Sequence, residues 1–182
     1  MVDKVFQQLY DLIKGDFKNS FLGGNVVLQD STSKKVKLNK KGPILCLQPD
    51  KKIKDWKNNF PFFETSVSTS CSVSDHLIIY PKTDTLYVFI IELKSKNVNG
   101  AISQIRASFE LSKYICGTAV RLLNYPSINI EYRGLIFSHK PPRKGTSKPV
   151  QTYTEDTISN LLYRHLQSGN DYDLDILSAK KI

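Results

Sequence analysis

The 182-residue chain has few of the residues that build disulfide frameworks or zinc sites. Its three cysteines, Cys46, Cys71 and Cys116, are odd in number and lack the paired spacing of metal ligands, so we expect reduced thiols. No apolar run approaches the ~20 residues that a membrane-spanning helix needs. The amphipathic residues 1–14 lack the continuous apolar core of a secretory signal. We therefore expect a cytoplasmic protein without a membrane partner.

Other familiar patterns are absent too. The sequence has no internal repeat, no glycine-rich phosphate loop, and neither a Ser-His-Asp nor a Cys-His pattern. Acidic residues are scarce: 17 acids face 26 lysines and arginines, which gives a net charge of +9. A basic protein of this kind suits a polyanionic partner, because lysine and arginine contacts to phosphates supply most non-specific affinity for nucleic acid.

The most informative segment is 74–96, which predicts two β-strands folded back on each other. A turn centred between Thr83 and Asp84 places Asp75 opposite Glu92. Opposed residues in such a hairpin have Cβ atoms about 5 Å apart. Lys94 is two residues beyond Glu92 and therefore points to the same face of the sheet. The sequence thus predicts two carboxylates and one ammonium group at one end of an apolar hairpin.

Two carboxylates this close repel each other unless a cation lies between them. Mg²⁺, or Mn²⁺ in its place, prefers oxygen ligands and is commonly held by one or two carboxylates together with waters and substrate phosphates. A nearby lysine can position a water molecule or stabilise charge on a phosphate. The cluster therefore favours metal-assisted hydrolysis of a phosphodiester, with a structural salt bridge among the three side chains as the plainer alternative.

Asp75 followed by Glu92-Leu93-Lys94 resembles the signature of the PD-(D/E)xK nuclease superfamily, which includes restriction endonucleases and RecB-type exonucleases. Gln104, ten residues after Lys94, is similar to the extra glutamine of exonuclease-like members. Ser74 stands where the family usually has proline. The resemblance covers about residues 60–137 and implies a core of one helix, three antiparallel strands, a second helix and a further strand.

The resemblance also implies roles for these residues. Asp75 and Glu92 would bind Mg²⁺ or Mn²⁺, with the Leu93 carbonyl as a third ligand. Lys94 would position or activate the attacking water, and Gln104 would support Lys94 or the phosphate. Many members add an acid from the first core helix; here Glu64, the only glutamate before Glu92, is the alternative extra ligand.

We expect one α/β domain over residues 1–182, with a mixed, mostly antiparallel central sheet flanked by helices. An N-terminal helix and basic ribbon (1–59) precede the core, and a loop and helix (138–182) follow it. Residues 65–73 are predicted as the first core strand. Residues 154–167 are predicted as a helix, because Thr154, Glu155 and Asp156 form a typical helix start.

Clusters of basic residues flank the predicted core and are candidate phosphate contacts. The plain alternative is a solvated surface. The residues that we select are Lys34, Lys35, Lys37, Lys51, Lys54, Lys140, Arg143 and Lys144.

Three functions stay open at this level. The first is a metal-dependent nuclease, with DNA favoured over RNA. The second is a catalytically degenerate module that keeps the fold and binds nucleic acid. The third, by analogy alone, is a subunit of a larger defence or mobile-element complex, as a homodimer or with a protein partner.

Overall fold

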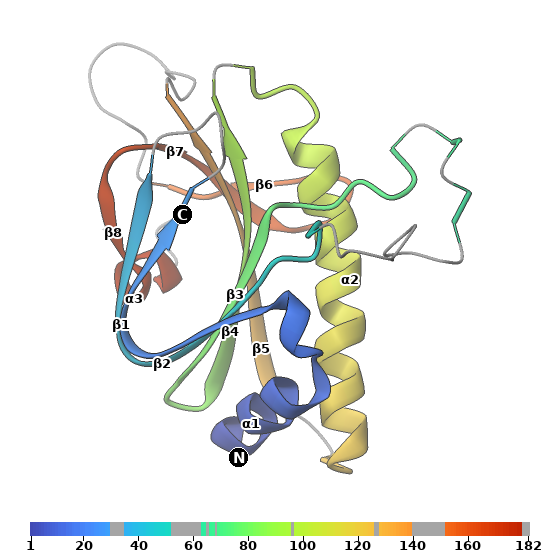
Figure 1. Cartoon of the computed structure of the whole chain (residues 1–182), viewed down its shortest axis with the longest axis vertical. Coiled ribbons are helices and arrows are strands. Elements are labelled where there is room, and N and C mark those ends of the chain that lie inside the picture. Colours follow the sequence, from blue (N-terminus) through green and yellow to red (C-terminus); the bar gives the residue numbers. More distant parts are fainter. Residues whose placement is uncertain are drawn as a thin grey trace.

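The computed structural model describes residues 1–29, 35–51, 63–64, 66–67, 69–95, 97–125, 128–139 and 152–179, with the backbone alone for 19–24. These residues form a single sheet with helices on both faces (Figure 1). Its elements are α1 (Val2–Leu12), a 3₁₀ turn (Gly15–Phe17), β1 (Lys18–Leu28), β2 (Val36–Leu47), β3 (His76–Lys82), β4 (Thr85–Lys94), α2 (Ala101–Leu122), β5 (Asn129–Ser138), β6 (Thr154–Glu155), β7 (Leu162–Gln167), β8 (Asp171–Asp173) and α3 (Leu174–Ser178).

The sheet has eight strands in the order β1-β2-β3-β4-β5-β7-β6, and β8 pairs with β2. The strands β1 to β4 pair antiparallel with one another, and so do β6 and β7, whereas β4 with β5, β5 with β7 and β2 with β8 pair in parallel. The predicted mixed, mostly antiparallel sheet is therefore confirmed. Strand β4 lies in the middle and is buried over most of its length, as its nearly continuous apolar sequence indicates.

Two apolar layers cover the sheet, one on each face. Helices α1 and α2 pack over Leu77, Val88 and Ile90 on one face. On the other face, α3 packs with the layer that contains Tyr80 and Phe89. Figure 1 shows α2 running along the sheet with α1 beside it, while α3 and β8 lie across the sheet from them. Among the described residues, no helix is both long and apolar enough to span a membrane.

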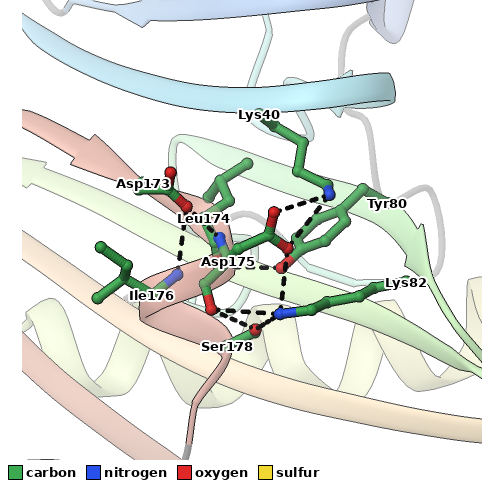
Figure 2. A network of polar contacts seen from close by, with 8 residues as sticks. All are labelled: Lys40, Tyr80, Lys82, Asp173, Leu174, Asp175, Ile176 and Ser178. Atoms are coloured by element: carbon green, nitrogen blue, oxygen red, sulfur yellow. Dashed lines mark hydrogen bonds and ion pairs between the residues drawn. The ribbon is translucent and has the colours of Figure 1, made fainter.

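The short helix α3 is attached to the sheet by a polar network (Figure 2). The Asp175 carboxylate binds the Lys40 ammonium at 3.0 Å and the Lys82 ammonium at 3.1 Å. The Tyr80 hydroxyl donates to the Leu174 carbonyl at 2.9 Å. Because Lys40 comes from β2 and Lys82 from β3, these contacts tie the end of the chain to two strands.

The strand predicted over residues 65–73 is wrong. The described residues from 66 to 71 form turns, in which the Ser70 N–H donates to the Val67 carbonyl and the Ser72 N–H to the Thr69 carbonyl. The Ser70 hydroxyl also donates to the Glu64 carbonyl. Serine and threonine side chains compete in this way with strand pairing. Strand β2, far earlier in the chain, takes the place beside β3 instead.

The helix predicted over 154–167 is also wrong. The Asp156 carboxylate accepts hydrogen bonds from the Ser159 backbone N–H and hydroxyl, which closes a turn rather than opening a helix. Leu162 and Leu166 then pack on one face of the sheet while Tyr163 packs on the other, as in a strand. Pairing of this segment with β5 overrides its helical spacing of leucines. After β7 the chain forms only the short strand β8 before α3 begins.

Candidate active site at the end of the central hairpin

The β3–β4 hairpin has the predicted register. Its turn contains Thr83, whose φ of 53° is left-handed, and Lys82 pairs with Thr85 across it. At the far end His76 pairs with Ile91, so Asp75 and Glu92 follow as the next opposed residues. The predicted opposition of these two acids is therefore present at the end of the hairpin.

Both acids belong to the face that α2 covers. Leu77 and Ile90, each two residues from one of these acids, pack in the layer beneath α1 and α2. His76 points to the other face, where its Nδ1 lies 4.0 Å from the Cys46 sulfur. His76 therefore faces away from the two acids.

Glu92 is the most unusual group of the site, because its side chain is only 1% exposed. Its Oε1 binds the Lys94 ammonium at 2.5 Å, whereas Oε2 is buried without a hydrogen-bond partner in the part of the chain that the structure describes. Burial, and then the negative charge of Asp75, raises the pKa of Glu92 to about 7, although Lys94 acts in the opposite direction. A buried carboxylate oxygen without a partner is rare in folded proteins and calls for a physical explanation.

Lys94 is held from two sides. Besides Glu92, its ammonium donates to Gln104 Oε1 at 2.7 Å. The Gln104 amide nitrogen in turn donates to the Val73 carbonyl at 3.2 Å. Gln104 lies in the first turn of α2, which begins after the left-handed Gly100. The predicted contact between Gln104 and Lys94 is confirmed, and it connects α2 to the segment that leads into Asp75.

Asp75 is fixed by the backbone of the neighbouring strand. Its Oδ2 accepts the Leu93 N–H at 2.6 Å. The preceding residue is fixed to α2, because the Ser74 N–H donates to the Ser108 hydroxyl at 2.7 Å. The Leu93 side chain packs into the layer on the opposite face. Leu93 therefore contributes its backbone to the site and its side chain to the core.

The sequence did not reveal two further side chains near the site. Ser108 lies one turn beyond Gln104 in α2, and its hydroxyl accepts the Ser74 N–H. Ser138 pairs with Lys94 across β4 and β5, is fully buried, and has no hydrogen-bond partner for its hydroxyl among the described residues. The parallel pairing that brings Ser138 beside Lys94 joins strands about forty residues apart, and no local pattern indicates it.

The extra acid and the basic residues are less concentrated than expected. Glu64 is exposed and its Oε1 accepts the Ser66 N–H in a local turn. In the part of the chain that the structure describes, no three His, Cys, Asp or Glu side chains form a metal-binding group, so Glu64 does not join Asp75 and Glu92.

The selected basic residues are spread along the molecule. Lys35 is exposed just before β2, and the Lys37 ammonium binds the Asp171 carboxylate of β8 at 3.4 Å. Both lysines lie at the start of β2. The acids lie at its other end, where Leu47 pairs with Leu77, two residues from Asp75. Lys51 donates to the Asp16 carbonyl at 2.7 Å. The others lie outside the described residues: Lys34, Lys54, Lys140, Arg143 and Lys144.

Comparison with known proteins adds no relative. No family model, curated protein or solved structure matches the chain.

Proposed function

We propose that the protein is a divalent-metal-dependent nuclease that hydrolyses phosphodiester bonds, with DNA as the expected substrate. The observation that carries this proposal is the Glu92 carboxylate, which is buried beside Asp75 with one oxygen bonded to Lys94 and the other without a partner among the described residues. A charged group in such a place is costly unless a ligand compensates it.

The residues present fit a hard cation. The orphaned Glu92 Oε2 is an oxygen ligand of the kind that Mg²⁺ and Mn²⁺ take, and Asp75 supplies a second carboxylate across the hairpin. When bound, a divalent ion would polarise the phosphodiester and lower the pKa of a coordinated water. Two carboxylates with waters and phosphate oxygens are a common set of ligands for such an ion.

The other side chains have roles that follow from their contacts. Glu92 and Gln104 hold the Lys94 ammonium in one place, where it can orient a water or stabilise negative charge on a phosphate. Gln104 is a positioning residue, because it acts through Lys94. The Leu93 N–H holds Asp75 against rotation, and the Leu93 carbonyl remains the proposed third ligand.

The order of elements also supports the proposal. Helix α1 is followed, after β1, by the antiparallel strands β2, β3 and β4, then by α2 and by β5, which is parallel to β4. This succession is what the resemblance to PD-(D/E)xK nucleases implies, with β2 in place of the strand expected near residue 70. The net charge of +9 favours a phosphate-rich substrate.

The test is a cleavage assay on linear, circular and single-stranded DNA with Mg²⁺, Mn²⁺ or EDTA, comparing wild type with Glu92→Ala. We expect metal-dependent cutting that is lost in the variant, whose folding is checked by circular dichroism. The preferred substrate would separate exonuclease from endonuclease activity. Cutting that persists in Glu92→Ala would contradict the assigned site.

One observation favours a second candidate, a degenerate module that binds nucleic acid without cutting it, alone or as a subunit of a larger complex. The described residues supply two clustered carboxylates rather than three, and Lys94 neutralises one of them directly. In that case both wild type and Glu92→Ala would fail to cut DNA. Wild type would still bind DNA, and Asp75→Ala would bind it with unchanged affinity.

A further inference from the structure

Ser138 is a buried serine at the end of β5, beside Lys94. The parallel pairing of β5 with β4 sets Ser138 next to Lys94, and neighbouring strands lie only about 4.8 Å apart. Ile136, two residues earlier, packs in the layer beneath α1 and α2. Because side chains two residues apart point to one face of a sheet, Ser138 shares the face that carries Glu92 and Lys94.

The Ser138 hydroxyl has no hydrogen-bond partner among the described residues, although the side chain is fully buried. Its backbone is paired, because the Ser138 carbonyl accepts the Ser168 N–H at 2.9 Å. At the same end of the sheet, Ser74, Glu92 and Ser168 each carry a buried side-chain oxygen that likewise lacks a partner in the described chain. Buried polar atoms are nearly always hydrogen-bonded, so this concentration indicates that a ligand or a side-chain rearrangement completes their contacts.

The Lys94 ammonium has a third N–H group for which the described residues supply no acceptor. It can donate three hydrogen bonds, and two of them go to Glu92 Oε1 and Gln104 Oε1. A serine hydroxyl has two acceptor lone pairs and can rotate to suit its partner. Ser138 therefore offers the kind of atom that Lys94 lacks, on the strand next to it.

Glu92 has two competing roles in the proposed site. It binds Lys94 through Oε1 and would bind the divalent ion through Oε2. An ion on this carboxylate takes up part of its negative charge and repels the ammonium beside it. Binding of the ion therefore weakens the Glu92–Lys94 contact, and without another acceptor Lys94 would be held by Gln104 alone.

We propose that Ser138 is a positioning residue that holds Lys94 in the metal-bound site. Once the ion weakens the contact with Glu92, the Lys94 ammonium donates to the Ser138 hydroxyl and to Gln104 Oε1. These two acceptors are neutral, so the positive charge of Lys94 becomes available to a phosphate oxygen of the substrate. This inference rests on the proposed nuclease function for the ion and the phosphate.

The first test is a double-mutant cycle in DNA cleavage with Mg²⁺, using wild type, Ser138→Ala, Lys94→Met and the double variant. We expect Ser138→Ala to lower kcat about tenfold, as the loss of a hydrogen bond to a charged group does, and to leave KM unchanged. In the Lys94→Met background the same substitution should have no further effect, whereas a merely structural role lowers the rate by the same factor in both backgrounds. Ser112→Ala is the matched control and should cut like wild type, because Ser112 is a fully buried serine of α2 whose hydroxyl donates to the Phe109 carbonyl at 2.8 Å.

The second test needs no cleavage and compares urea unfolding in EDTA with urea unfolding in Mg²⁺. In EDTA, Ser138→Ala removes an unpaired buried hydroxyl, so the variant should unfold at the same urea concentration as wild type or at a higher one. In Mg²⁺ the Lys94 ammonium bonds to this hydroxyl, so the variant should unfold at a lower urea concentration than wild type. This reversal should be absent when both proteins also carry Lys94→Met.

Two cleavage results would overturn the inference. One is a Ser138→Ala enzyme that cuts as fast as wild type, and the other is a rate that falls by the same factor with and without Lys94. If wild type cuts no DNA under any metal condition, the nuclease proposal fails and urea unfolding decides the role of Ser138. A reversal that depends on Lys94 then supports Ser138 as its metal-linked partner, and no reversal overturns the inference.

Discussion

Two carboxylates of this protein, Glu92 in β4 and Asp175 in α3, are each bound by a lysine ammonium group and differ in what surrounds them. Within the described ranges, Glu92 is bound by one lysine, is 1% exposed and has one oxygen without a hydrogen-bond partner. Asp175 has two lysines and is 39% exposed (Figure 2). Burial and Asp75 raise the pKa of Glu92 to about 7. Partial burial would also raise the pKa of Asp175, but hydrogen bonds from Lys40 and Lys82 outweigh it and lower that pKa.

Asp175 contributes to the stability of the fold through its ion pairs. Glu92 instead is buried at a cost in free energy. Asp175 is compensated within the protein, and its ion pairs attach α3 to the sheet. Glu92 is not fully compensated within the protein, so a ligand has something to supply there. Perturbed pKa values of this kind concentrate at functional sites, although structural ion pairs also produce them.

The largest contrast is expected between the two partner lysines. Lys94→Met should lower the cleavage rate roughly 1000-fold, as the loss of a group that stabilises developing charge does. Lys40→Met should leave the rate unchanged and cost about 1 kcal/mol of unfolding free energy through the lost Asp175 contact. Single-turnover cleavage and urea unfolding of both variants measure this. A Lys94→Met enzyme that cuts as fast as wild type would remove Lys94 from the site.

The two carboxylates should also have opposite effects on stability as the pH changes. The raised pKa of Glu92 means that its protonated form stabilises the fold below pH 4.5 and that this contribution is lost as the pH rises through 7. Urea unfolding at pH 4.5 and pH 8 without metal should show a loss of about 3 kcal/mol that is missing in Glu92→Gln. The lowered pKa of Asp175 means that its contribution is present above its usual value of 3.8 and is lost below it. Identical pH profiles for wild type and Glu92→Gln would contradict the assigned environment of Glu92.

Divalent ions should distinguish the two regions in a third way. At pH 8, Mg²⁺ or Mn²⁺ at a hundred times its Kd should stabilise wild type by about 2.7 kcal/mol. Glu92→Gln and Asp75→Asn should abolish this gain, while Asp175→Asn should keep it. Thermal unfolding with and without the ion measures the shift, and an equal shift in all four proteins would indicate non-specific ion binding.

The smallest effect is expected at Gln104. It holds Lys94 against the Val73 carbonyl but touches neither a carboxylate nor the substrate, so Gln104→Leu should lower kcat about tenfold, or about 1.4 kcal/mol. Ser103→Ala, an exposed neighbour on the same helix, is the control. If Gln104→Leu acts by releasing Lys94, its pH–rate profile should shift. A general loss of structure would lower the rate without shifting the profile.

The parts of this protein that were predictable from sequence are those fixed by short-range geometry. The two-residue turn at Thr83 and Asp84 determines the hairpin register, and the register determines that Asp75 opposes Glu92. The spacing from Lys94 to Gln104 includes a short loop and the first turn of α2, so their contact could be predicted as well.

The parts that were not predictable depend on partners far away in the chain. Residues 162–167 carry leucines at helical spacing and become a strand because β5 offers an open edge. Residues 66–71 have the β-branched composition of a strand, but their hydroxyls and a left-handed Thr69 close turns instead. Ser138 reaches Lys94 only through the parallel pairing of β4 with β5, which forms after the whole of α2 has intervened.

The hydrogen bond from the Leu93 amide to the Asp75 carboxylate makes one backbone proton part of the site. That proton lies on the central strand, yet its acceptor is a side chain that is also a proposed metal ligand. In an NMR spectrum of the labelled protein, the Leu93 amide resonance should therefore move when a cation or a proton takes the place of this bond. A single peak can then report occupancy of the site without substrate, turnover or mutation.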